Sequence, residues 1–272
     1  MIRSVRALVF RCPIETPVVT SFGIMRDRPM VLVRVEDDDG AVGWGETWCN
    51  FPTVGAEHRA RLIESVIAPL LEGRSFERPE EAFRLLNART AVLALQAGEP
   101  GPIAQAIAGV DIALWDLAAR RAGEPLWRML GGRSPRVRVY ASGLNPDEPE
   151  KLAAKKRAEG FAAFKLKVGF GADRDIANLK ALRRELGDDV DLMVDANQGW
   201  SLNDAVEMAP RLEAFDLRWL EEPLRADSPW NDWEVLSRHT RIPLAAGENI
   251  GSDDGFDAAL HAAALEIGRA HV

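Results

Sequence analysis

The chain has 272 residues, of which 47% are hydrophobic and 28% charged, proportions that are typical of a globular protein. Its formal net charge of -8 argues against nucleic acid or an anionic membrane surface as the main partner. No apolar run approaches the roughly eighteen residues of a membrane span, and the apolar start is too short for a signal peptide. Cys12 and Cys49 match no zinc or disulfide-framework spacing, so we expect a cytoplasmic protein.

The first third of the chain predicts strands followed by helices. Segments 5–10 and 30–47, the second with a DDDG turn, favour an antiparallel meander. Helical periodicity follows near residues 57–72, 79–95 and 102–122. We therefore expect an α+β domain over residues 1–125.

From Val137 onward, short apolar runs alternate with amphipathic helical stretches. The expected strands are VRVYASG, FKLKVG, DLMVDANQG, LRWLEEP and IPLAAGEN. The expected helices between them lie near 147–159, 173–186, 202–214 and 230–239. This alternation is typical of a parallel sheet built from βα units. We expect a second domain over 126–272, with about five of the eight units that a closed barrel needs.

Two lysines, Lys165 and Lys167, interrupt the apolar run FKLKVG. Side chains alternate across a strand, so both lysines lie on one face, where each lowers the pKa of the other. A KxK pair by itself is explained better by two solvated lysines without a role.

Charged residues stand at the ends of four successive strands. They are Lys167, Asp195, Glu221 and Glu248, separated by 28, 26 and 27 residues. In a (β/α)₈ barrel, successive strand ends surround one opening, where such enzymes place their chemistry. A single acid at a strand end is often a helix cap, but four charges at one-unit spacing are hard to explain in that way.

Three carboxylates in a partly dry opening repel one another unless a hard divalent cation binds them, and Mg²⁺ suits oxygen ligands best. A lysine beside that ion can act as a base near neutral pH. This combination favours removal of a proton next to a carboxylate, because the cation stabilises the resulting ene-diolate. We predict Lys167 as the base and Lys165 as the residue that tunes it and holds the substrate carboxylate. The predicted metal ligands are Asp195, Glu221 and Glu248.

The runs KLKVG, VDANQGW, WLEEPL and AAGENIG, with AIAGVDIALWDLAARRAGEPLWRMLGG before them, closely resemble the enolase superfamily. Within it, they resemble the mandelate racemase and muconate-lactonizing branch, to about Leu265. The resemblance implies an α+β capping domain followed by a (β/α) TIM-type barrel, here incomplete. It implies the same base, partner lysine and Mg²⁺ ligands, and it places Asn197 beside the substrate. Glu222 would help to order the ligands.

The glutamate of GEN, Glu248, resembles the mandelate-racemase-like group, because the muconate-lactonizing group usually has aspartate there. The resemblance therefore implies an acid-sugar dehydratase or a mandelate-type racemase acting on a small carboxylate, an acid sugar or 2-hydroxy acid. The full-length enzyme would be a homo-oligomer. A cycloisomerase or epimerase of the same superfamily is the alternative, which this glutamate disfavours. A non-catalytic, truncated metal-binding protein is another, which the intact base and ligands disfavour.

Two loops of the capping domain would supply substrate contacts. One is TPVVTSFGIMR, with Ser21 and Phe22, and the other is ETWCNFP, with Trp48 and Asn50. Inward packing of Trp48 is an equally good explanation for that aromatic residue.

The C-terminal end departs from the family pattern. The group's second catalytic pair, an aspartate and a histidine on later strands, has no counterpart, and His271 comes one βα unit too early. The last six residues, IGRAHV, can be back-translated to a sequence that resembles a common sequencing adapter. We therefore expect residues 266–272 to be non-native, and the chain to be an inactive fragment of a longer enzyme.

Overall fold

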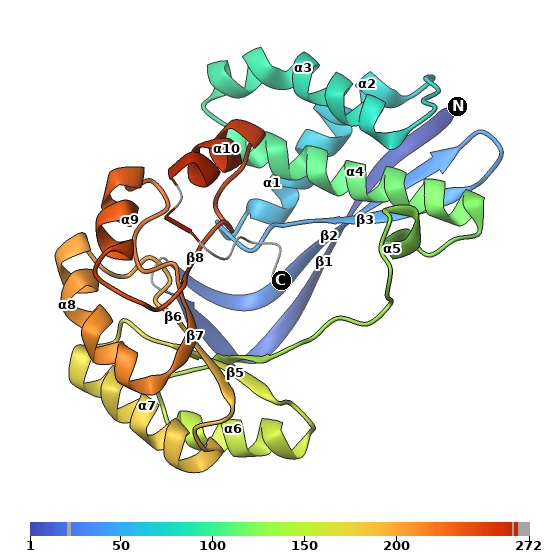
Figure 1. Ribbon diagram of the computed structural model, residues 1–272. Coiled ribbons are helices and arrows are strands. Elements are labelled where there is room, and N and C mark those ends of the chain that lie inside the picture. The colour runs from blue at the N-terminus through green and yellow to red at the C-terminus, as the bar shows by residue number, and fades with distance from the viewer. Residues whose placement is uncertain (21–22, 263, 266–272) are drawn as a thin grey trace. The chain divides into compact units, whose positions relative to one another are not determined.

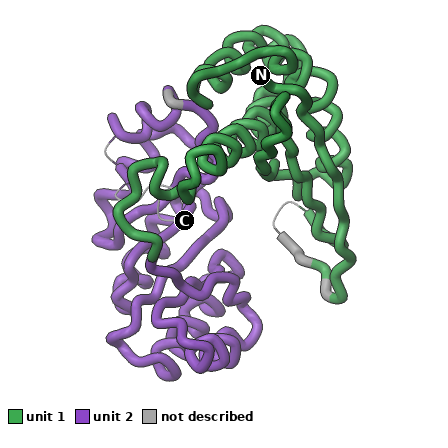
Figure 2. The backbone as a smooth tube through the Cα atoms, turned by 90° about the vertical axis from the view of Figure 1, so that its right-hand side faces the viewer, with its two compact units in different colours: residues 1–136 green, residues 137–272 purple. Residues whose placement is uncertain are grey.

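The computed structural model describes residues 1–20, 23–262 and 264–265. The chain forms two compact units, Met1–Arg136 and Val137–Val272, which are coloured separately in Figure 2. The second unit starts where the sequence pattern changes, whereas the predicted domains divide the chain after residue 125. Each unit is described by itself below.

Unit 1 contains a three-stranded antiparallel sheet of order β1-β2-β3, as the predicted meander requires (Figure 1). Its strands are β1 (Ile2–Thr20), β2 (Gly23–Asp37) and β3 (Val42–Thr47). Val31, Val33 and Val35 of β2 are fully buried beneath helices. The helices of this unit are α1 (Gly55–Leu62), the π-helical η1 (Ile63–Ile67), α2 (Ala68–Leu71), α3 (Pro79–Ala97), α4 (Pro100–Ala122) and α5 (Leu126–Met129).

Helix α4 lies against β3 at backbone contact distance. A Cβ atom on Gly45 would lie 2.1 Å from the carbonyl oxygen of Gly109, and one on Gly43 would lie 2.1 Å from the carbonyl oxygen of Ala113. Real Cβ atoms do not tolerate such distances, so both positions require glycine for close approach. The alternating glycines of VGWGET thus determine how the helix packs on the sheet.

We expect Gly45→Ala to lower the free energy of unfolding by about 3 kcal/mol, because the new methyl group meets backbone atoms that cannot move aside. Gly101→Ala is the matched control, since a Cβ there meets nothing within 4 Å and alanine favours the helix. Urea unfolding of both variants measures the difference. Equal stability of Gly45→Ala and the wild type would contradict this packing.

Helix α4 is also long and apolar enough to cross a membrane, judged by length and composition alone. The sequence analysis found no such run because Gln105 and Asp111 interrupt it. Half of its apolar window is buried within the structure, and residues such as Ile107 and Val110 belong to the core of unit 1. This pattern is that of a core helix.

The carboxyl group of Asp111, on α4, has a raised pKa. Its Oδ1 atom has no hydrogen-bond partner among the described residues, and neither does Oε2 of nearby Glu80. Burial, followed by the negative charge of Glu80, raises the pKa of Asp111 from 3.8 to about 6.

Because the folded protein holds this proton more tightly than the unfolded chain, Asp111 should make the free energy of unfolding fall as the pH rises from 3.8 to about 6. We expect Asp111→Asn to remove that fall, whereas the exposed Glu64→Gln should not. Urea unfolding at several pH values between 4 and 7.5 tests this. An unchanged pH profile in Asp111→Asn would show that the carboxyl group is well solvated.

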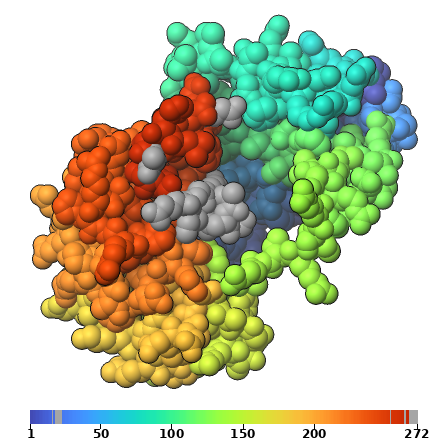
Figure 3. Space-filling view, viewed as in Figure 1, coloured from blue at the N-terminus to red at the C-terminus, as the bar shows by residue number. Residues whose placement is uncertain are grey.

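Unit 2 contains a five-stranded parallel sheet of order β4-β5-β6-β7-β8. Its strands are β4 (Ala141–Leu144), β5 (Ala163–Lys167), β6 (Asp191–Asp195), β7 (Leu217–Glu221) and β8 (Leu244–Ala245). Its helices are α6 (Pro149–Ala158), α7 (Ala172–Leu186), α8 (Leu202–Leu212), the 3₁₀ helix η2 (Glu213–Phe215), α9 (Trp230–Ser237) and α10 (Asp253–Ala262). Helices α7 to α9 form the yellow and orange outer surface of this unit in Figure 3.

This arrangement confirms the predicted partial barrel of five βα units. Outward-facing residues such as Phe164, Leu166 and Val194 are fully buried in the core of the unit. Two details differ from the prediction. The strand expected at VRVYASG begins only at Ala141, and α10 was not expected.

The register of the sheet aligns the predicted site residues. Lys167 is paired with Asp195, and Asp195 is paired in turn with Glu221. Three charged residues from three strands therefore lie in one row at the carboxyl edge of the sheet.

Candidate functional site

Lys167 is held by two residues of the next strand and its loop. Its Nζ atom donates hydrogen bonds to Oδ2 of Asp195 and Oδ1 of Asn197, each at 2.6 Å. Asn197 has a left-handed backbone, with φ of 45°, and its N–H donates to Oδ1 of Asp195 at 2.8 Å. This local turn brings the Asn197 amide to the amine of Lys167, whereas contact of Asn197 with the substrate remains a prediction.

Lys165 lies on the same face and is only 6% exposed. Its Nζ atom donates to both carboxylate oxygens of Glu221 at 2.7 Å and lies 3.2 Å from Oδ2 of Asp195. Burial by itself would lower the pKa of Lys165, but the charges of Asp195 and Glu221 outweigh it and raise that pKa above its ordinary value. The sequence analysis considered only the effect of one lysine on the other, and the carboxylates of the neighbouring strands reverse the net direction of the shift for Lys165.

Glu248 lies beyond the short strand β8 and interacts with Glu222. The Glu222 side chain is 3% exposed, and its backbone φ of 40° is unusual for glutamate. Burial, followed by the charge of Glu248 and a hydrogen bond with it, raises the pKa of Glu222 to about 8. Oε1 of Glu222 accepts from Asn249 at 3.4 Å, whereas Oε2 has no partner among the described residues.

These carboxylates have the chemistry that a hard cation requires. Four of them, Asp195, Glu221, Glu222 and Glu248, follow or end neighbouring strands, and the buried Oε2 of Glu222 is unsatisfied. Burial is the main cause of the raised pKa of Glu222, and the negative charges of Glu248 and Asp195 add to it. An oxygen-ligated divalent cation fits this donor set, because it would offset that charge.

The predicted ligands do not, however, form one tight group. Across the part of the chain that the structure describes, the group of three acids with oxygens within 4.8 Å of one another is Asp37, Asp38 and Asp39 in unit 1. Asp37 forms ion pairs with the Met1 amine and with Arg121, so its charge is already compensated. Asp195 and Glu221 are likewise paired with lysines, and Glu248 is turned toward Glu222.

The predicted substrate residues of unit 1 are only partly described. Ser21 and Phe22 lie outside the described residues. Trp48 is 48% exposed, which contradicts the alternative that it packs inward, and Asn50 is half-buried. The substrate contacts of all four residues remain a prediction.

An arginine that the sequence analysis missed ties the loop containing Trp48 to the β1–β2 hairpin. The guanidinium of Arg11 donates to the carbonyl oxygen of Thr53 at 2.7 Å, to both oxygens of Glu57, and to Asp27 of β2 at 2.9 Å. These ion pairs hold strand, loop and helix α1 in one arrangement within unit 1.

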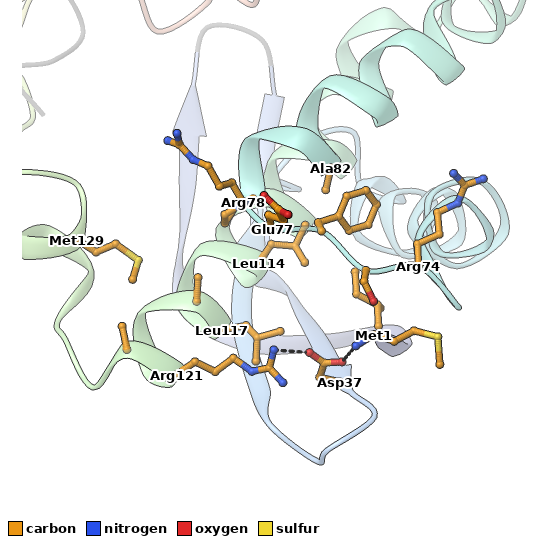
Figure 4. A pocket seen from close by; sticks show the side chains of 16 residues that line it. Met1, Asp37, Arg74, Glu77, Arg78, Ala82, Leu114, Leu117, Arg121 and Met129 are labelled. Carbon is orange, nitrogen blue, oxygen red and sulfur yellow. Dashed lines mark ion pairs between the residues drawn. The ribbon is translucent and has the colours of Figure 1, made fainter.

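A cavity of 540 Å³ in unit 1 contains none of the predicted site residues. Figure 4 shows Asp37 bridging Arg121 and Met1 at its edge, while Arg74 and Arg78 point apart. Its cationic side chains do not converge, so we do not assign the candidate site to this cavity.

Comparison with known proteins gives the family. The profile of the mandelate racemase/muconate lactonizing enzyme N-terminal domain matches residues 3–131, and that of the enolase C-terminal domain-like family matches residues 148–272. A 3,6-anhydro-alpha-L-galactonate cycloisomerase from Streptomyces coelicolor is 37% identical over 98% of this chain and 74% of its own length. The chain belongs to the mandelate racemase/muconate lactonizing enzyme family of the enolase superfamily.

Solved structures of this family support the fold. A mandelate racemase/muconate lactonizing enzyme from Bordetella bronchiseptica superposes with a TM-score of 0.92 and 58% identity, over 98% of this chain and 70% of that one. A racemase from Streptomyces coelicolor with bound magnesium superposes with a TM-score of 0.90 and 35% identity, over 97% of this chain and 74% of that one. An arabinonate dehydratase from Saccharolobus solfataricus is 32% identical over 82% of this chain and 60% of its own length. Cycloisomerases, dehydratases and racemases are thus all similar to this mandelate racemase family member.

The sequence analysis also missed residues of this family member that support the site within unit 2. Asp175 is 1% exposed and accepts the N–H groups of Gly169 and Phe170, which fixes the loop after Lys167. Trp219 donates its indole N–H to Glu221 at 3.0 Å. Strand alternation could have revealed Trp219, because it stands two residues before Glu221 on the same face.

Proposed function

We propose that this chain is part of a Mg²⁺-dependent enzyme that removes the proton α to the carboxylate of an acid sugar. The observation that carries the proposal is the row Lys167–Asp195–Glu221, aligned on three parallel strands with Lys165 among them. It places two amines and two carboxylates at the edge where parallel-barrel enzymes carry out chemistry.

Asp195, Glu221 and Glu248 would hold the Mg²⁺ ion, and Glu222 would compensate charge beside them. The magnesium bound to the racemase from Streptomyces coelicolor supports the choice of cation. When bound, Mg²⁺ supplies positive charge that stabilises an ene-diolate.

The two lysines would have different roles in the reaction. Lys167, held by Asp195 and Asn197, would take the α-proton at its Nζ atom, which requires its neutral form. Lys165, whose pKa the carboxylates raise, would stay an ammonium and attract the substrate carboxylate. A charged lysine beside a neutral one is the arrangement that binding followed by proton abstraction needs.

The fate of the ene-diolate separates the candidate reactions. A dehydratase would expel the β-hydroxyl group, and a racemase would return the proton from the opposite face. A cycloisomerase is the second candidate, because the relatives that are 37% and 33% identical are both named cycloisomerases. Those names outweigh the argument against a cycloisomerase from Glu248 alone.

The proposal is tested by incubating the full-length protein with Mg²⁺ and a library of acid sugars and their lactones in D₂O. A 2-keto-3-deoxy acid would indicate dehydration, an epimer racemisation, and an opened or rearranged ring cycloisomerisation. If NMR detects neither product nor α-deuterium with any member, the proposal is wrong.

We further propose a cytoplasmic homo-oligomer that binds neither nucleic acid nor membranes. Relatives are longer than the region matched here, and 26% of the cycloisomerase from Streptomyces coelicolor lies outside it. We propose that the 272-residue chain is inactive by itself, because five βα units leave one side of the site unbuilt. Residues 266–272, which we expect to be non-native, lie outside the described residues.

A further inference from the structure

Glu221 receives hydrogen bonds from two sides of the inner face of unit 2. The Lys165 ammonium approaches both of its oxygens at 2.7 Å, and the Trp219 indole N–H donates to Oε2 at 3.0 Å. Trp219 and Glu221 lie on the same strand, β7, two residues apart. The indole N–H of Trp219 therefore restrains the Glu221 carboxylate from within the same strand, β7.

The ring of Tyr140 supports both donors. It meets the Trp219 ring edge to face, with centroids 5.6 Å apart and an interplanar angle of 76°. The Lys165 Nζ atom lies 5.4 Å from the Tyr140 centroid, within cation–π range. Tyr140 and Trp219 also line a 510 Å³ cavity of unit 2 that reaches Ala163 and Asp191, the first residues of β5 and β6.

We propose that Trp219 and Tyr140 are positioning residues of the metal site: the indole N–H sets the orientation of the Glu221 carboxylate, and the Tyr140 ring holds the indole and the Lys165 ammonium in place. This inference rests on the proposed function, since it assigns Glu221 to a Mg²⁺ ion. Hydrogen bonds to a ligating carboxylate reduce its freedom before the metal arrives, and their loss typically weakens metal binding about 10- to 100-fold.

Both side chains could instead simply fill the barrel interior, and the variants must separate these two roles. Trp219→Gln keeps an N–H donor at the same number of bonds from Cβ as the indole nitrogen, whereas Trp219→Met has nearly the same length without a donor. Tyr140→Phe keeps the aromatic face and Tyr140→Leu removes it. Trp230→Phe, on α9 against the Trp233 ring, controls for loss of an indole elsewhere.

The readout is the Kd for Mn²⁺, measured by electron paramagnetic resonance on the full-length protein, among variants whose circular dichroism matches the wild type. We expect Trp219→Met to raise the Kd by about 10-fold, and Trp219→Gln to raise it by less than about 3-fold. Tyr140→Leu should raise it several-fold, and Tyr140→Phe and Trp230→Phe should leave it unchanged.

Equal Kd values for Trp219→Gln and Trp219→Met would overturn the inference, because the donor would then have no effect. So would wild-type affinity in Trp219→Met. If the wild type itself binds no Mn²⁺, the proposed function is wrong, which is a different outcome from failure of the indole's role.

Discussion

Replacing Lys167 with alanine in the full-length protein is expected to slow exchange of the substrate α-proton with solvent by about 10³-fold or more. Removal of the amine leaves nothing at that position to accept the proton. The fold and metal binding should persist, because Asp195 keeps Lys165 at 3.2 Å and the Asn197 N–H at 2.8 Å. Lys167 is also 25% exposed, so its loss leaves little buried space.

Deuterium incorporation at the α-carbon, followed by NMR in D₂O with the best substrate from the library, measures this effect. Lys180→Ala, an exposed lysine of α7, is the control and should exchange at the wild-type rate. Lys167→Arg should be as slow as the alanine variant, because a guanidinium stays protonated and cannot act as a base. Exchange at the wild-type rate in Lys167→Ala, with the wild type active, would assign the base to another residue.

The row of site residues could be predicted because it depends on two local regularities. Side chains alternate along a strand, and each βα unit adds a nearly constant number of residues, so Lys167, Asp195 and Glu221 had to end adjacent strands on one face. The register found in the sheet is the one that this reasoning requires.

The contact between Glu222 and Glu248 could not be predicted in this way. The left-handed backbone at Glu222, with φ of 40°, turns its side chain out of the alternation that governs the strand before it. A sequence pattern carries no signal for such a conformation in glutamate, which rarely adopts it. The direction of the pKa shift of Lys165 depends likewise on contacts between strands. The carboxylates that raise this pKa, Asp195 and Glu221, come from β6 and β7.

Element boundaries in the first unit were also harder to predict than their order. Strand β1 continues to Thr20 through Pro13 and Pro17, residues that usually weaken a strand assignment. Pairing with β2 extends it, and only the antiparallel partner supplies that information. The ion pairs of Arg11 are likewise long-range, joining residues up to 46 positions apart.

Asp195→Asn is expected to raise the Kd for Mn²⁺ about 100-fold or more and to abolish α-proton exchange. Asp195 is the acid that contacts both lysines, through Oδ2, while Oδ1 accepts the N–H of Asn197. The amide keeps the shape of the side chain but removes its negative charge. A hard cation requires that charge, and both lysines form ion pairs with it. Loss of a residue that only hydrogen-bonds a metal ligand typically weakens metal affinity about 10- to 100-fold. Loss of a direct ligand should therefore weaken it by at least about 100-fold.

Asp191→Asn provides a matched control on the same strand. Asp191 begins β6 where Asp195 ends it, and it also pairs with cations, Arg218 at 2.6 Å and Arg138 at 3.0 Å. The same chemical change at the opposite end of the strand should leave Mn²⁺ binding intact. If Asp195→Asn binds Mn²⁺ as tightly as the wild type while Asp38→Asn does not, the cation binds to the acidic cluster of unit 1. The carboxylates at the strand ends would then be structural partners of the two lysines.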